Sequence, residues 1–172
     1  KKKIVPHIRL SGIIGSVGRF KQGINFSGQQ EIIDKAFSIK KALAIAVSIN
    51  SPGGGVSATH KVYQLIRDFK EKYNIPVYFH TRDILTSGSY WIALSGDKIF
   101  ADYGSVIGSI GVKGPNWLYY NSPTSLSEGL FGRSVESKNG LKLFSNTAGI
   151  YKDIFNPFRK PTPEEIGKLQ VM

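Results

Sequence analysis

The sequence predicts an α/β fold, and three observations carry this prediction. Residues 42–50 (ALAIAVSIN) form a short, almost entirely apolar run, which is typical of an interior parallel strand buried on both faces. Residues 57–73 repeat apolar side chains at helical spacing, which predicts an amphipathic helix directly after that strand. Further apolar runs and helical patterns alternate at separations that suit right-handed strand–helix–strand units.

The remaining elements are predicted from the same two signals, short apolar runs for strands and helical spacing of apolar residues for helices. Short apolar runs bounded by Gly, Pro or Asn predict further strands at 5–14, 77–80 and 98–101. Helical spacing of apolar residues predicts further helices at 29–41 and 87–95. The basic, Gly-rich stretch 12–28 is expected to be a loop.

The C-terminal half carries a weaker signal. Residues 104–111 are Gly-rich with apolar residues between the glycines, and 113–147 are rich in Ser, Gly and Asn, which favours a long loop or a hairpin. A last helix is expected to start near Thr162, which can cap it, with Pro163 in its first turn.

Length and composition narrow the class of protein. The 172 residues suit one domain with a substantial core, and 41% hydrophobic with 20% charged residues excludes a disordered chain. No apolar run approaches the roughly 18 residues that a membrane-spanning helix needs. The chain has no cysteine, which excludes disulfides, thiolate metal sites and a cysteine nucleophile. The three histidines are far apart and form no HExxH pair, so a histidine metal site is not expected. No cofactor is expected either.

The formal net charge of +11 raises the question of an anionic partner. The first 30 residues hold six basic groups and no acid, but no segment interleaves basic residues with aromatics as single-strand binders do. Nucleic acid is therefore not expected as a partner. A plain solvated basic surface is the favoured account of the charge, and an anionic membrane surface is the best specific partner.

Two local motifs carry candidate chemistry. The sequence Ser51-Pro52-Gly53-Gly54-Gly55 lies between the interior strand and its helix, so its backbone amides can form an oxyanion site at a helix N-terminus; the alternative is a flexible turn. Ser87 precedes Gly88 at a predicted helix start, where it can act as a nucleophile or simply as an N-cap.

A serine nucleophile needs a base, and the residues alone leave it open. A histidine triad would draw on His7, His60 or His80 and on an aspartate, of which the chain offers Asp68, Asp83, Asp97 and Asp102. Alternatively, apolar neighbours in GIYKDIF would desolvate Lys152 and favour its neutral amine, while Asp153 would oppose this if its carboxylate faces the amine. On the sequence alone, the favoured interpretation of Lys152 is a solvated surface lysine without a catalytic role.

Five motifs in one order resemble the signal peptide peptidase A (protease IV) family of Ser/Lys-dyad serine peptidases. They are SGIIG (11–15), INSPGGGV (49–56), TSGSYWIALSGDKIFAD (86–102), GSVIGSIGV (104–112) and GIYKDIFNPFRKPTPEE (149–165). The resemblance implies the crotonase/Clp-protease-like ββα superhelix.

The resemblance also implies roles for individual residues. Ser87 matches the nucleophile, Lys152 the general base, and Ser109 a serine that hydrogen-bonds the base. Gly54 and Gly88 match the oxyanion hole. The residues expected to contact substrate are Gly53, Gly55 and Ser89, the last of which stands where family members usually have glycine.

At the level of the whole protein, the resemblance implies hydrolysis of cleaved signal peptides and other short apolar peptides at the cell membrane, on its extracytoplasmic side. It implies a homo-oligomer whose neighbouring subunits share each dyad. Residues 1–172 are then expected to be a single catalytic domain, without the family's N-terminal membrane anchor and C-terminal helices. The stretch 112–148 is longer than in short family members, and its apolar and aromatic segment 117–132 suits a substrate lid or a subunit contact.

Three other functions remain open for the same fold. An acyl-CoA enzyme of the crotonase type would use the Gly54 region as a thioester oxyanion hole and would not need Ser87 or Lys152. A scaffolding module would bind peptides without turnover. A phage head-maturation or membrane-quality-control peptidase would keep the chemistry and change the substrate.

Overall fold

The computed structural model describes residues 3–15, 23–129, 132–149, 152–153, 156–157 and 159–169. The chain divides into two compact units, 1–110 and 111–172, and each is described by itself. The expectation of a single catalytic domain stays a prediction.

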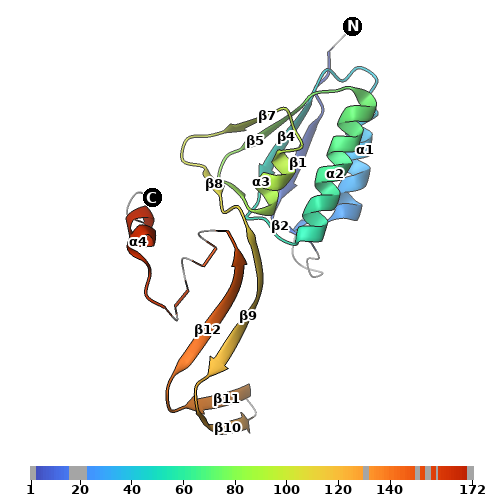
Figure 1. Cartoon of the computed structure of the whole chain (residues 1–172). Helices are drawn as coiled ribbons and strands as arrows, with labels where there is room; N and C mark the ends of the chain where they lie inside the picture. The colour runs from blue at the N-terminus through green and yellow to red at the C-terminus, as the bar shows by residue number, and fades with distance from the viewer. Residues whose placement is uncertain are drawn as a thin grey trace. The chain divides into compact units, whose positions relative to one another are not determined.

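The first unit is built on a four-stranded parallel sheet with the order β1–β4–β5–β7 (Figure 1). Its strands are β1 (His7–Ser11), β4 (Ile45–Asn50), β5 (Val77–Thr81) and β7 (Lys98–Ala101). The predicted interior parallel strand is confirmed, since β4 pairs with both β1 and β5. The prediction of burial on both faces is wrong: Ile45, Val47 and Ile49 are buried, whereas the residues between them are only half-buried.

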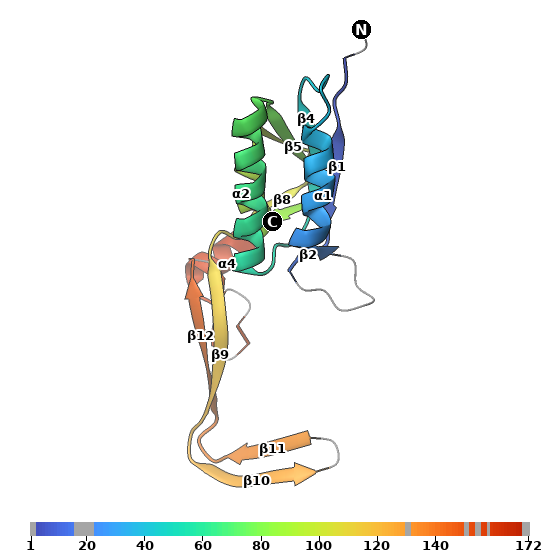
Figure 2. The same ribbon diagram turned by 90° about the vertical axis from the view of Figure 1, so that its right-hand side faces the viewer.

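The helices of this unit are α1 (Phe26–Phe37), α2 (Val56–Tyr73) and α3 (Gly88–Ala93). Figure 2 shows α1 and α2 running side by side along the sheet. Helix α1 begins before residue 29 because the Asn25 side chain accepts the Gly28 N–H at 2.7 Å and caps the helix there. Helix α2 ends at Tyr73, as predicted, and Asn74 follows it as a C-cap with a left-handed φ of 50°.

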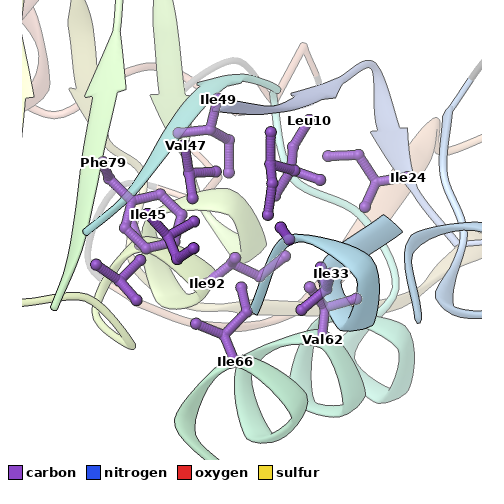
Figure 3. Packing of buried hydrophobic residues seen from close by; sticks show 14 of the residues in the cluster. Leu10, Ile24, Ile33, Ile45, Val47, Ile49, Val62, Ile66, Phe79 and Ile92 are labelled. Atoms are coloured by element: carbon purple, nitrogen blue, oxygen red, sulfur yellow. The ribbon is translucent and has the colours of Figure 1, made fainter. Parts of the chain in front are cut away.

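A single apolar cluster joins the sheet to these helices (Figure 3). Its members include, from the strands, Leu10, Ile45, Val47, Ile49 and Phe79, and from the helices Ile33, Val62, Ile66 and Ile92. This packing explains the helical and alternating patterns of the sequence, because each element turns its apolar residues toward the same layer.

A second layer consists of short extended segments that the sequence did not predict. They are the parallel pairs β2 (Ile13–Ile14) with β3 (Gly23–Ile24), and β6 (Ile84–Thr86) with β8 (Val106–Gly108). Bridges from Gly54 to Ile14 and from Ser51 to Leu85 tie the segment after β4 into the same layer. Each long strand is thus followed by a short extended segment, and the first three also by a helix, which confirms the predicted α/β class and its ββα repeat.

Two predicted boundaries differ from those in the structure because of this second layer of short segments. The strand expected over 5–14 divides into β1 and β2 at Gly12, whose φ of 89° turns the chain from one layer to the other. The loop expected over 12–28 contains β2, β3 and the start of α1, and its residues 16–22 lie outside the described residues.

The second unit contains two antiparallel strand pairs and one helix. Strand β9 (Val112–Tyr120) pairs with β12 (Leu141–Ala148), and β10 (Pro123–Gly129) pairs with β11 (Gly132–Ser137) between them. The hairpin alternative for 113–147 is therefore confirmed. Helix α4 (Pro163–Leu169) begins at Pro163, and the Thr162 hydroxyl accepts the Glu165 N–H at 3.2 Å, so the predicted cap is confirmed.

Within the described part of the chain, no helix combines the length and the apolar character that crossing a membrane requires.

Candidate active site

Ser87 lies at the junction of β6 and α3 with an unusual backbone. Its φ of 56° and ψ of −124° fall in a region that non-glycine residues seldom occupy. Such a conformation costs about 1–3 kcal/mol and persists only where the surroundings hold it in place. The strained turn therefore makes Ser87 a candidate functional residue rather than an ordinary helix cap; in addition, its side chain makes no capping hydrogen bond.

Two backbone hydrogen bonds fix this turn. The Ser87 N–H donates to the Gly108 carbonyl at 2.9 Å, and the Ser87 carbonyl accepts the Trp91 N–H at 3.1 Å. The first bond fastens the serine to the end of β8, and the second starts α3. The half-buried Ser87 side chain therefore projects from a backbone that is held on both sides.

Gly53 lies directly against the turn formed by Ser87 and Gly88, the serine turn. A Cβ built on Gly53 would be 2.7 Å from the Ser87 Cβ and 2.8 Å from the Gly88 nitrogen, and the Gly53 φ is 97°. Only glycine fits both the conformation and the space. The structure thus brings together the two motifs that the sequence singled out separately, the Gly-rich loop and the serine.

Gly54 presents its N–H away from the short strand β2. In the bridge between Gly54 and Ile14, the Ile14 N–H donates to Gly53 at 2.9 Å and the Gly55 N–H donates to Ile14 at 2.8 Å. This parallel pattern uses the groups that flank Gly54 and turns the Gly54 N–H to the opposite side. A side chain there would collide with the Ile14 carbonyl.

The N–H groups of Gly54 and Gly88 are available as donors. No hydrogen bond from either N–H to another described residue is present. Gly88 is the first residue of α3, where helix N–H groups have no partner within the helix. By contrast, Gly55 donates its N–H to Ile14 and accepts the Thr59 N–H, so it caps α2 and has no free donor for a substrate.

Ser109 follows Gly108, the residue whose carbonyl holds Ser87. Ser109 is exposed and has a φ of 51°, so it is a second strained serine next to the serine turn. The structure therefore brings the Ser109 backbone close to that of Ser87. Its role toward the base stays a prediction.

The histidines have other contacts. His80 Nε2 lies 2.9 Å from Asp102 Oδ1, His7 Nε2 shares a 2.7 Å hydrogen bond with the Ser48 hydroxyl, and the His60 ring lies near Trp91. His80 with Asp102 is the one histidine–carboxylate pair among the described residues. No group of three or more potential ligands suited to a metal ion occurs in that part of the chain.

Lys152 belongs to the second unit, and its environment favours a neutral amine. The side chain is half-buried, and this burial lowers the pKa of the Lys152 amine below its ordinary value. The neighbouring Asp153 carboxylate accepts hydrogen bonds from Arg159 Nε at 3.1 Å and from Asn156 Nδ2 at 3.2 Å. The Asp153 carboxylate is therefore paired with the Arg159 guanidinium.

The family model of Peptidase family S49 matches residues 69–172 of this sequence. The chain belongs to peptidase family S49. This match spans the serine turn, Ser109 and Lys152, and it confirms the family to which the five motifs point.

Two relatives with protease names agree with this S49 assignment, and one solved structure shares the fold. A putative protease of Methanocaldococcus jannaschii is 35% identical over 140 residues, which cover 81% of this chain and 39% of that protein. A putative signal peptide peptidase of Enterococcus faecium is 28% identical over 168 residues, 95% of this chain and 44% of that protein. The structure of a mutant of a membrane-bound stomatin-specific protease shares the fold, with a TM-score of 0.52 and 23% identity over 73% of this chain and 54% of that chain.

A protein of Brucella melitensis named as a Na⁺/H⁺ antiporter is also similar, with 34% identity over 169 residues. The match covers 98% of this chain but 21% of that protein, so it concerns one segment of a much longer polypeptide. The chain spans from about a fifth to less than half of the length of these three curated relatives.

Sequence reasoning gave no individual role to two residues, Asn50 and Ser51, that support the segments on either side of the serine turn of this S49 chain. The Asn50 Oδ1 accepts hydrogen bonds from the Thr81 hydroxyl at 3.1 Å and the Asp83 N–H at 3.1 Å, and its amide donates to the Asp83 carboxylate. Ser51, only 1% exposed, accepts the Gly53 N–H on its hydroxyl at 3.1 Å. The sequence signal that could have identified them is the pair of polar residues, Asn50 and Ser51, at the end of an apolar strand.

Ser89 is fully buried, and its hydroxyl is hydrogen-bonded to backbone carbonyl groups. It donates to the Ser51 carbonyl at 2.7 Å and to the Thr86 carbonyl at 2.8 Å. The hydroxyl therefore ties the end of β4 to the serine turn. This geometry favours a positioning role for Ser89 over the direct substrate contact that was expected from the sequence.

Proposed function

We propose that this chain carries the catalytic centre of a serine peptidase with Ser87 as nucleophile and Lys152 as general base. The observation that carries the proposal is the strained serine turn, packed against Gly53 and flanked by two N–H groups available to an oxyanion. The S49 family match and the lowered pKa of the Lys152 amine support it.

In the proposed reaction, the Ser87 hydroxyl attacks a peptide carbonyl while the neutral Lys152 amine takes its proton. The N–H groups of Gly54 and Gly88 donate to the oxyanion of the tetrahedral intermediate, where loss of one donor typically lowers the rate about 10²–10³-fold. Lys152 then delivers the proton to the leaving amine, and water hydrolyses the acyl-enzyme with Lys152 again as base. The Ser109 hydroxyl would orient the amine.

We further propose that the substrates are cleaved signal peptides and other short apolar peptides, hydrolysed at the extracytoplasmic side of the cell membrane. An extended apolar peptide can pair with a strand edge and place alternate side chains in pockets. The name of the Enterococcus relative supports this substrate class. We also propose a homo-oligomer in which Ser87 and Lys152 of one site come from neighbouring subunits.

A serine-reactive phosphonate and a fluorogenic apolar peptide test the catalytic proposal. Ser87→Ala should abolish both labelling and hydrolysis, and Lys152→Ala should abolish hydrolysis with an unchanged circular dichroism spectrum. Lys160→Ala, which removes an exposed lysine of the same segment, is the control and should stay active. Substantial hydrolysis by Lys152→Ala would rule out the dyad, and saturable binding of coenzyme A by calorimetry would favour an acyl-CoA enzyme instead.

Mixing two inactive variants tests whether subunits share the dyad. If they do, Ser87→Ala and Lys152→Ala chains assembled together regain activity, because one supplies the lysine and the other the serine. If each dyad lies within one chain, the mixture stays inactive, since no chain then holds both residues.

A further inference from the structure

A polar hollow of about 240 Å³ opens on the first unit. Its lining residues come from three neighbouring strands and the turn that follows them, and they are Arg9, Leu10, Ser11, Ser48, Ile49, Asn50, His80 and Arg82. Most of these residues do not belong to the serine turn, and the proposed peptidase reaction does not use them.

The strand register explains why the side chains of Arg9, Ser48 and His80 share one surface. Arg9 pairs with Ser48, and Ser48 pairs with His80, so the three stand in one row across β1, β4 and β5. Successive residues of a strand point to opposite faces. Arg9 therefore lies on the face opposite the buried Ile8 and Leu10, which belong to the apolar cluster. Arg82 lies two residues after His80, directly beyond β5.

Three of the polar side chains in the wall of the hollow, those of Ser48, Asn50 and His80, already have partners within the protein. The Ser48 hydroxyl is bonded to His7, and His80 is bonded to Asp102. Asn50 uses its carbonyl for the turn after β5 and its amide for the Asp83 carboxylate. Both nearby acids, Asp83 and Asp102, are thus occupied by other groups.

The two arginines differ from the rest of the wall. Both are exposed, and neither forms an ion pair or a side-chain hydrogen bond with any described residue. The hollow therefore combines two guanidinium groups that lack a carboxylate with a lining of hydroxyl, amide and imidazole groups. Planar guanidinium forks match the oxygen atoms of a phosphate, and charge-assisted bonds of this kind are the strong ones.

We propose that this hollow is a phosphate-binding site in which Arg9 and Arg82 bind one phosphate group together. The phosphate comes either from inorganic phosphate or from the headgroup of a phospholipid. The residues that line the hollow do not include Ser87, Gly54 or Gly88, so phosphate binding is measured without a peptidase assay.

Calorimetric titration of the full chain with inorganic phosphate tests the site, and co-sedimentation with phosphatidylcholine vesicles, with and without phosphatidylglycerol, distinguishes the source. Arg9→Ala and Arg82→Ala should each weaken binding about tenfold or more, because each removes a hydrogen-bonded charge. Arg67→Ala is the matched control: it removes an exposed arginine of α2, which lines a different hollow, with the same change in net charge.

Each outcome decides the proposal. Saturable phosphate binding that is lost in both pocket variants and kept in Arg67→Ala supports a site for the free ion. Binding to phosphatidylglycerol vesicles alone, with the same dependence on the two arginines, supports a lipid headgroup. The proposal is overturned if neither probe binds, or if Arg67→Ala loses as much binding as the pocket variants. Circular dichroism melting of the three variants confirms that they are folded.

Discussion

The backbone of Gly53 lies so close to Ser87 that a Cβ on the glycine would be 2.7 Å from the Cβ of the serine. Real Cβ atoms do not approach this closely, so the two motifs that carry the proposed chemistry can coexist only with glycine at position 53. The contact also fixes the distance between the Gly-rich loop and the start of α3. Oxyanion donors have to be placed in advance at such a distance to be effective.

Gly53→Ala should therefore lower kcat/KM by at least about 100-fold, since a displacement of about 1 Å near the reacting atoms has an effect of this size. The added methyl group would push the loop away from Ser87 and Gly88. Steady-state hydrolysis of an apolar peptide, together with thermal melting, measures the two effects separately.

Gly104→Ala is the matched control for this prediction. Gly104 also has a positive φ, 87°, but a Cβ there would meet nothing within 4 Å. The substitution should lower stability by about 1 kcal/mol through backbone strain alone and leave kcat/KM unchanged. Equal losses of activity in both variants would show that strain, rather than the contact with Ser87, is responsible.

Ser89→Ala should lower both stability and activity, because the buried hydroxyl connects Ser51 to the serine turn. The lost hydrogen bonds should reduce the free energy of unfolding by about 1 kcal/mol. Loosening of the turn should reduce kcat/KM by about tenfold, less than the loss expected for a full 1 Å displacement. Chemical denaturation and steady-state kinetics measure the two quantities.

Ser95→Ala serves as its control, since Ser95 is equally buried and donates its hydroxyl to the Ile92 carbonyl at 2.6 Å. A similar loss of stability is expected from this variant, with no loss of activity. If Ser95→Ala impaired hydrolysis as much as Ser89→Ala, the positioning role of Ser89 would have to be abandoned.

The long elements of the first unit could be predicted from the sequence because their apolar residues repeat over several turns or pairs. Strands β6 and β8 could not, since three residues are too few to show a period. These strands exist because they pair with each other and because Ser51 bridges to Leu85. The predicted ends of elements were wrong where a single side-chain contact sets the end, as the Asn25 cap does at the start of α1.

The residues of the candidate site likewise divide into those that a local motif identifies and those that act through distant contacts. Ser87 and the glycines stand in recognisable local motifs, so the sequence was sufficient to single them out. Asn50 and Ser89 act on residues that are 33 and 38 positions away along the chain. No local pattern reveals contacts of this kind, so the sequence singled out Ser89 without its role, and the supporting contacts of both residues became visible only in the folded structure.

The proposed base should give hydrolysis a characteristic dependence on pH. Only the neutral amine of Lys152 accepts a proton, and burial lowers the pKa of this amine below its ordinary 10.5. The logarithm of kcat/KM should therefore rise with pH and level off at an apparent pKa below 10.5. Lys152→Arg should be inactive at every pH, because a guanidinium stays protonated. A profile without this rise would contradict the assignment of Lys152.

Arg159 joins the Lys152 segment to α4, and this link should make stability depend on acid pH. Arg159 donates to both oxygens of Glu165, at 2.6 and 2.8 Å, and also to Asp153. These bonds from Arg159, with the Thr162 N–H, lower the pKa of Glu165 to about 2. The folded state thus binds the Glu165 proton more weakly than the unfolded chain, so the stabilisation is complete above pH 4.5 and is lost as the pH falls toward 2.

Glu165→Gln should consequently lower the melting temperature near neutral pH, and the difference from the unmodified chain should shrink as the pH falls from 4.5 toward 2. Circular dichroism melting at a series of pH values measures this difference. Glu164→Gln, which neutralises the adjacent exposed carboxylate in the same helical turn, should produce a smaller effect at neutral pH. A Glu165→Gln difference that stayed constant down to pH 2 would mean that the side chain acts through packing, because an ion pair with Arg159 cannot survive protonation of the carboxylate.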